Sequence, residues 1–261
     1  MNTTLLITAL LPVVILLLYI YRKDKMQPEP VGQIVKAFLL GLLTVPLSFF
    51  VSVPSEMIGL YSDNVFSVMD AFRISFFGAA IPEEAAKLFI LWLVLRKNKY
   101  FDEKMDGIVY AVCVSMGFAA LENITYLISN LDSYMEVGVS RAFTAIPGHF
   151  CFGVVMGYYY SLAAFDKKDR QRNRILTFAA PVIVHGLYDT ILFASEAVVD
   201  SFSPIDENVV LLVSVFFTAL FIYFCFKMWK FGSLKIKQHI ANDKEDSMKA
   251  QEEFNGLFGN N

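Results

Sequence analysis

The sequence is poor in several features that mark soluble enzymes and metalloproteins. Charged side chains make up 18% of its 261 residues, against roughly a quarter in an average soluble domain. Its three cysteines, Cys113, Cys151 and Cys225, lie in apolar runs without zinc-ligand or disulfide spacing, and we interpret them as packing residues. We find no HExxH motif, no internal repeat, and no charged n-region or cleavage site of a signal peptide. These absences argue against a disulfide scaffold and against a zinc peptidase of the HExxH type.

Long apolar runs are what the sequence does contain. It is 56% hydrophobic, has a mean hydropathy of +0.52 and carries 25 phenylalanines. Several runs approach the roughly 20 apolar residues that cross the hydrocarbon core of a bilayer. We therefore predict an all-α, multi-pass bundle of about seven transmembrane helices. The predicted spans cover about residues 4–21, 34–53, 65–95, 107–128, 142–165, 176–194 and 209–228.

Two of these spans carry helix-disturbing residues. Pro46 predicts a kink in the second span. The run 65–95 is too long for one upright helix and too short for two crossings. Gly78 and Pro82 place a break near its middle. We expect a shallow or tilted piece over about 65–77, followed by a main helix that begins at Pro82 or passes through a kink there.

The basic residues alternate between loops and predict an orientation. The loops after the first, third and fifth spans carry three, four and five Lys or Arg, and the segment from Lys227 carries six. The opposite loops carry almost none apart from Arg141. The positive-inside rule then places the N-terminus outside the cell and the C-terminus in the cytoplasm. We expect a bundle over 1–229 and a polar, partly disordered cytoplasmic tail over 230–261.

Ionisable side chains lie inside these apolar runs. The segment IPEEAAK, residues 81–87, places Glu83, Glu84 and Lys87 where each charge costs roughly 2.5–3.5 kcal/mol at the bilayer centre. At 1.5 Å per residue from the cytoplasmic helix ends, further ionisable groups fall at a similar depth. These are Glu122, His149, His185 and Asp189. Four spans are thus expected to place them in one band near the membrane midplane.

Each group also has a purely structural interpretation. Lys87 is spaced to pair with Glu83 at i,i+4 and with Glu84 at i,i+3, which would let a polar helix sit in the bundle. His185 and Asp189 are i,i+4, so that the carboxylate can fix the imidazole tautomer. Arg141 is interpreted as an interfacial residue, and Asp106 as a possible N-cap of the fourth span.

Three chemistries fit such a layer. A glutamate could activate water for peptide hydrolysis while a histidine polarises the carbonyl. The same carboxylates and histidines could bind zinc. Midplane acids and histidines also form proton or ion relays in transporters, although transporter folds often show repeats.

Five motifs, taken in order, resemble the PrsW family of intramembrane proteases over about residues 29–189. They are EEAAK at 83–87, DGIVYA at 106–111, GFAALEN at 117–123, the segment around His149, and HGLYD at 185–189. The resemblance implies a membrane-embedded endopeptidase, distantly similar to the CAAX-processing and bacteriocin-immunity proteases. It further implies that the substrate is a single-pass anti-sigma factor, cut on its extracytoplasmic side to begin release of a sigma factor.

The resemblance also suggests roles for residues. Glu83 and Glu84 match the paired catalytic glutamates, and His185 matches the second histidine of the wider superfamily. Glu122 replaces the histidine of its FxxxH motif, and Asp189 stands where many members have Asn. His149 is then the candidate for the missing imidazole.

Our working hypothesis has Glu83 as base and Glu84 positioning it or sharing the proton. The two histidines polarise the substrate, and Glu122 and Asp189 orient them. We expect a multi-pass protein of the cell membrane whose partners are its substrate and the lipid bilayer, with no cofactor and no nucleic acid. Zinc bound by Glu122, His149, His185 and Asp189 is the alternative mechanism. A non-enzymatic sensor or a proton- or ion-coupled transporter is the alternative function.

Overall fold

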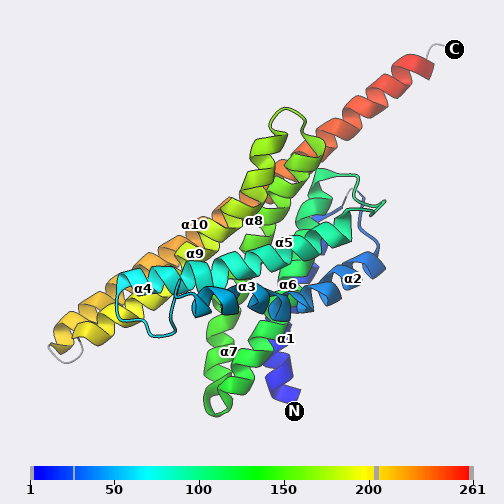
Figure 1. Cartoon of the computed structure of the whole chain (residues 1–261). Helices are drawn as coiled ribbons and strands as arrows, with labels where there is room; N and C mark the ends of the chain where they lie inside the picture. The colour runs from blue at the N-terminus through cyan, green and yellow to red at the C-terminus, as the bar shows by residue number, and fades with distance from the viewer. Residues whose placement is uncertain (1–2, 26, 203–205, 259–261) are drawn as a thin grey trace.

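The apolar runs form α-helices in the computed structural model, which describes residues 3–25, 27–202 and 206–258 (Figure 1). No strand occurs among these residues, so the all-α prediction is confirmed. The helices are α1 (Thr3–Lys23), α2 (Val31–Leu42), α3 (Thr44–Met57), α4 (Val68–Arg73), the π-helix η1 (Ile74–Ala80), α5 (Ile81–Leu95), α6 (Lys104–Ser129), the 3-10 turn η2 (Leu131–Ser133), α7 (Tyr134–Phe143), α8 (Ala145–Phe165), α9 (Arg170–Phe202) and α10 (Glu207–Phe258).

Six helical segments of the described chain are long and apolar enough to cross a membrane. They are α1, α2 with α3, α6, the segment from η2 through α8, α9, and α10. This confirms a multi-pass helical bundle. The remaining predicted span, 65–95, consists of α4, η1 and α5, with 6, 7 and 15 residues, which follow one another without interruption.

The two predicted irregularities take different forms. Helix α2 ends at Leu42 and α3 begins at Thr44, so the break falls just before Pro46, whose nitrogen cannot donate to the Leu42 carbonyl. Near Gly78 and Pro82 the helix does not stop. It widens into η1 and continues as α5, with Pro82 in the first turn of α5. A π-helical turn accommodates the missing Pro82 N–H without ending the helix.

Helix α6 is the centre of the bundle. Most of its side chains are buried, from Met105 to Ala120 without exception. Small residues allow its neighbours to come close. A Cβ on Gly157 of α8 would lie 2.3 Å from the Gly107 carbonyl oxygen, and one on Gly41 of α2 would lie 2.3 Å from the Val114 carbonyl oxygen. Such contacts between small residues are typical of packed membrane helices.

Two predictions about polar segments are wrong. Residues 130–137, NLDSYMEV, fall between the fourth and fifth predicted spans and were therefore expected to form an acidic loop, but they contain η2 and the start of α7, whose Gly138 packs closely on Thr8 of α1. The tail is not disordered over residues 230–258, since α10 continues through it (Figure 1). Residues 259–261 lie outside the described part of the chain. As far as Asp243 the tail packs on the bundle, where Ile236, His239 and Asp243 are buried, and from residue 244 to 255 the helix is exposed.

Candidate active site

The first turns of α5 present two adjacent glutamates and a lysine to the interior. The Lys87 ammonium is 1% exposed and donates to Glu84 Oε1 at 2.8 Å and to Glu83 Oε2 at 3.3 Å. Both ion pairs expected from the sequence are therefore present. Because α5 follows η1 without a break, this polar turn lies inside a continuous helical path rather than at a free helix end.

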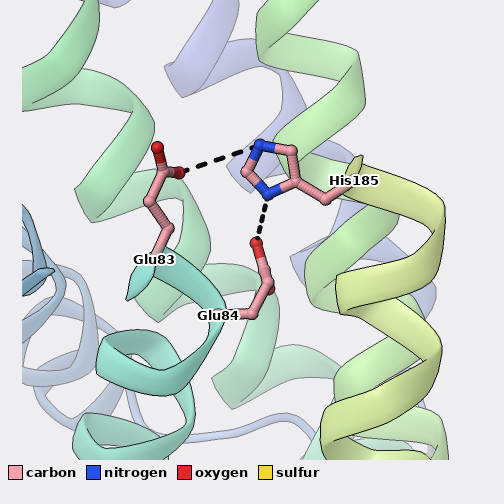
Figure 2. Close-up of side chains that lie close together, drawn as sticks. All are labelled: Glu83, Glu84 and His185. Atoms are coloured by element: carbon pink, nitrogen blue, oxygen red, sulfur yellow. Dashed lines mark hydrogen bonds and ion pairs between the residues drawn. The ribbon is translucent and has the colours of Figure 1, made fainter. Parts of the chain in front are cut away.

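Helix α9 places His185 against both glutamates (Figure 2). Its Nδ1 lies 2.9 Å from Glu84 Oε1, and its Nε2 lies 3.9 Å from Glu83 Oε2. Nε2 also lies 3.2 Å from Asp189 Oδ2, one turn along α9, as the HGLYD spacing predicted. Carboxylates face both ring nitrogens and can only accept when ionised, so the arrangement suits a doubly protonated imidazolium.

Helices α6 and α8 contribute a second acid–histidine pair. His149 Nε2 lies 2.9 Å from Glu122 Oε2, and His149 Nδ1 lies 3.3 Å from Lys87 Nζ. An ammonium can only donate, so Nδ1 accepts and the proton sits on Nε2, which donates to Glu122. Arg141 of α7 binds the same carboxylate through Nη2 at 2.5 Å and binds Asn123 Oδ1 through Nε at 2.8 Å.

Aromatic rings and one hydroxyl fix these groups in place. The Phe118 ring lies 4.0 Å below the Lys87 ammonium, a cation–π contact. The Phe152 ring stacks on His185 with centroids 4.4 Å apart. Ser115 Oγ donates to the His149 carbonyl at 2.7 Å. These contacts restrict the rotamers of Lys87, His149 and His185.

The structure brings all six predicted site residues together, and adds two cations that we had interpreted as structural or interfacial. We call this set the acid–histidine cluster. It consists of Glu83, Glu84, Lys87, Glu122, Arg141, His149, His185 and Asp189. Arg141 could have been noticed in the sequence, because it is almost the only basic residue in the loops that are predicted to lie outside. Glu84 is fully buried, whereas the side chains of Glu83, Asp189 and Glu122 are 13%, 16% and 19% exposed. Three of the four carboxylates are thus partly accessible from outside the cluster, whereas Glu84 is not.

The donor set also fits a metal ion. Ligand atoms of Glu83, Glu84 and His185 lie within 4.8 Å of one another, as do those of Glu83, Glu122 and His149. Histidine nitrogens and carboxylate oxygens are common zinc ligands. Charge agrees as well. A metal-bound histidine loses its proton, so a divalent ion would replace the imidazolium charge of His185, and the ion with Lys87 and Arg141 would balance the four carboxylates.

Fold and site together define a class: a multi-pass membrane protein with a buried centre of acids and histidines. Comparison with known proteins specifies it further. Residues 29–223 match the family described as the PrsW family intramembrane metalloprotease. Curated relatives named Protease PrsW are similar to the chain. The protein from Geobacillus kaustophilus is 37% identical over 71% of this chain and 78% of the relative. The protein from Bacillus subtilis is 38% identical over 70% of this chain and 80% of the relative.

The chain therefore belongs to the PrsW family of intramembrane proteases. No solved structure matches it. The resemblance drawn from the five motifs is confirmed, and so is a membrane-embedded peptidase of the cell membrane. The family description also names a metal, for which the acid–histidine cluster has suitable ligands.

Proposed function

We propose that Glu83 is the base that activates water for peptide hydrolysis. The observation that carries this proposal is the contrast between the two adjacent glutamates. Glu84 is fully buried, and its Oε1 accepts hydrogen bonds at 2.8 and 2.9 Å. Glu83 is partly exposed, and its contacts with Lys87 and His185 are 3.3 and 3.9 Å. A base must reach water and release its existing contacts, which Glu83 can do more easily.

The remaining groups support the bond changes. Glu83 removes a proton from water as the water oxygen bonds to the scissile carbonyl carbon. The His185 Nε2–H, which leaves its 3.2 Å contact with Asp189, stabilises the resulting oxyanion. The proton on Glu83 then passes to the amine nitrogen as the carbon–nitrogen bond breaks. Glu84 holds the His185 ring through Nδ1. Asp189 and Glu122 orient the Nε2–H groups of His185 and His149, and His149 acts as the second polarising group when its N–H turns from Glu122 to the substrate.

A metal would use the same residues. A divalent ion would be held by His149, His185 and the carboxylates facing them, and when bound it would supply Lewis-acid polarisation of the carbonyl and of water. Lys87 keeps its role in either case, because it holds Glu84 and the Nδ1 side of His149.

We propose that the substrate is a single-pass membrane anti-sigma factor, cut near the outer face to start sigma-factor release. The family resemblance supports the substrate class. The position of the cluster supports the side of cleavage. Glu122 lies seven residues before the end of α6 at Ser129, and His149 lies four residues after the start of α8 at Ala145. The positive-inside rule places both of these helix ends outside.

The test uses purified full-length protein in detergent with a panel of single-pass anti-sigma-like substrates. Glu83→Gln keeps the side-chain shape and removes the base, so we expect cleavage to fall by roughly 10²–10⁴-fold. The matched control is Glu56→Gln, an exposed glutamate of α3, which should cleave at the wild-type rate. Full cleavage by folded Glu83→Gln would refute the assignment.

A chelator separates the two mechanisms. Wild-type cleavage that survives a strong zinc chelator supports hydrolysis by Glu83 without a metal. Cleavage that the chelator abolishes and zinc restores assigns Glu122, His149, His185 and Asp189 to metal binding. Absence of cleavage for every anti-sigma-like substrate, with another membrane peptide cut, would reject the substrate class and keep the protease.

A further inference from the structure

A second group of acids lies at the opposite end of α6 from Glu122. Asp24 follows α1, and Glu103 and Asp106 lie at the start of α6. Their ligand oxygens lie within 4.8 Å of one another, and all three residues are buried. Asp106 and Glu122 are sixteen residues apart on one helix, about 24 Å at 1.5 Å per residue. This α6-start cluster is therefore separate from the acid–histidine cluster.

Local hydrogen bonds fix the three carboxylates but leave one oxygen without a donor. Asp106 Oδ2 accepts the backbone N–H groups of Asp102 at 3.0 Å and of Glu103 at 2.7 Å. Asp106 is thus not the N-cap that we expected but the N3 residue of a capping box whose N-cap is Glu103. Asp106 is only 1% exposed, and its Oδ1 accepts no hydrogen bond from the described residues. A buried, unpartnered carboxylate oxygen is costly unless a ligand fills the space it faces.

No cation of the described residues pairs with these acids. None of the ion pairs within 4.0 Å involves Asp24, Glu103 or Asp106. Two further buried acids, Glu29 and Asp243, stand beside them and are equally without an ion pair. Lys104 directly follows Glu103, but its ammonium binds Asp246 instead. Lys23 and Lys25 flank Asp24 in the sequence, and neither forms an ion pair with these acids within 4.0 Å. No cation of the described chain therefore contacts the carboxylates directly.

Space for further ligands lies beside the α6-start cluster. A cavity of about 240 Å³, lined by Asp24, Glu103 and Asp243, adjoins the cluster. Arg22, Lys23 and Lys25 line it as well.

We propose that the α6-start cluster binds a hard divalent cation of the calcium type. Its candidate ligands are all oxygens, which Ca²⁺, Mg²⁺ and Mn²⁺ prefer over nitrogen or sulfur. Ca²⁺ takes oxygen ligands at about 2.3–2.6 Å, so oxygens that lie within 4.8 Å of one another, as these do, can share one ion. The adjoining cavity has room for the water ligands that such ions retain.

The bound ion would join two parts of the chain and lie beside a third. Asp24 belongs to the link between α1 and α2, and Glu103 and Asp106 belong to the start of α6. Asp243 of α10 accepts the Lys104 and Met105 N–H groups at 2.9 and 2.8 Å, next to the same site. Cation binding would therefore stabilise the packing of the first link and of α10 on α6. This inference does not depend on the proposed mechanism of hydrolysis.

The test measures binding and thermal unfolding of the purified full-length protein in detergent, stripped with EDTA and kept near pH 8. We expect Ca²⁺ to bind the wild type by titration calorimetry and to raise its Tm saturably. Asp24→Asn and Glu103→Gln should each weaken Ca²⁺ affinity at least tenfold. Asp246→Asn, an exposed carboxylate at the same end of the molecule, should bind as the wild type does.

Several outcomes would overturn the proposal. One is absence of Ca²⁺, Mg²⁺ and Mn²⁺ binding by the wild type at millimolar concentrations, which would mean that shared protons neutralise the acids. Another is wild-type affinity in both cluster variants. A Ca²⁺ response that Glu83→Gln abolishes would instead place the ion in the acid–histidine cluster. If a cluster variant does not fold, the wild-type titration and the other variant still decide.

Discussion

At the scale of single residues, Lys87 organises the acid–histidine cluster. Its ammonium contacts carboxylates of α5 and the Nδ1 of His149 on α8, and the Phe118 ring of α6 covers it. One side chain thus connects three helices through polar contacts that lipid cannot replace. Removing one partner from such a buried ion pair leaves an uncompensated charge, which is costly.

We predict that Lys87→Met destabilises the protein strongly, by roughly 3–5 kcal/mol. The methionine fills a similar volume but leaves Glu83 and Glu84 without their cation. Thermal unfolding in detergent measures the effect. Lys97→Met is the matched control, because Lys97 is exposed and should change stability by less than about 0.5 kcal/mol. Equal stability of the two variants would show that the ammonium is not needed to hold the glutamates.

Much of the acid–histidine cluster could be predicted from the sequence, because polar groups inside apolar runs are conspicuous. Glu83, Glu122 and His185 were found in this way. Arg141 was not, because a cation near a helix start is usually interfacial. Its contact with Glu122 depends on α7, which we had predicted to be a loop. Which atoms meet is a matter of helix rotation and packing that linear spacing does not contain.

At the scale of helices, the crossing of α6 and α8 depends on small residues. Gly107 and Gly157 face each other, and a Cβ at Gly157 would lie 2.6 Å from Ile108 Cα. Because the obstacles are backbone atoms, the two helices would have to move apart. His149 and Glu122, which lie on these same helices, would then lose their 2.9 Å contact.

We predict that Gly157→Ala lowers stability by about 1–3 kcal/mol through this overpacking. It should also reduce protease activity, since it separates two parts of the acid–histidine cluster. Gly32→Ala in α2 is the control, because nothing lies within 4 Å of its Cβ position. Its higher helix propensity should leave stability unchanged or slightly raised. A Gly157→Ala variant as stable and active as Gly32→Ala would contradict the close crossing.

The breaks within helices were predictable in place but not in form. Pro46 and Pro82 both remove a backbone donor, and the structure is irregular just before each of them. One break interrupts the helix at Leu43, whereas the other is absorbed in η1. The difference arises from tertiary packing. η1 lies against α9, where the Phe76 ring sits directly over Gly186. A continuous helix keeps that contact and keeps Glu83 facing His185.

At the scale of the whole molecule, α10 connects the tail to the bundle. His239 Nε2 lies 3.1 Å from the Tyr158 carbonyl oxygen, and Asp243 accepts two N–H groups from the first turn of α6. Composition suggested disorder because most of the tail is polar. Burial of Ile236 and of these polar side chains could not be inferred without knowing where α6 and α8 begin and end.

We predict that truncation after residue 233 destabilises the protein by roughly 3 kcal/mol or more. It removes the Asp243 cap from Lys104 and Met105 and the buried Ile236 side chain. Truncation after residue 250 removes a stretch whose described side chains, residues 251–255, are exposed, and it should leave the Tm unchanged. Equal Tm values for both truncations would mean that the tail contributes nothing to folding of the bundle.

The last prediction concerns the orientation of the bundle. The membrane face that lies nearer to the acid–histidine cluster determines which part of a substrate the cluster can reach. The basic loops predict that residues 166–169, between α8 and α9, face the cytoplasm and that η2 faces outward. Asp132 and Lys168 are exposed, so single cysteines at these positions can be labelled in a background without the three native cysteines. In intact cells a membrane-impermeant maleimide should label position 132 and not 168. After permeabilisation it should label both. The reverse pattern would invert the bundle and move the proposed cleavage to the cytoplasmic side.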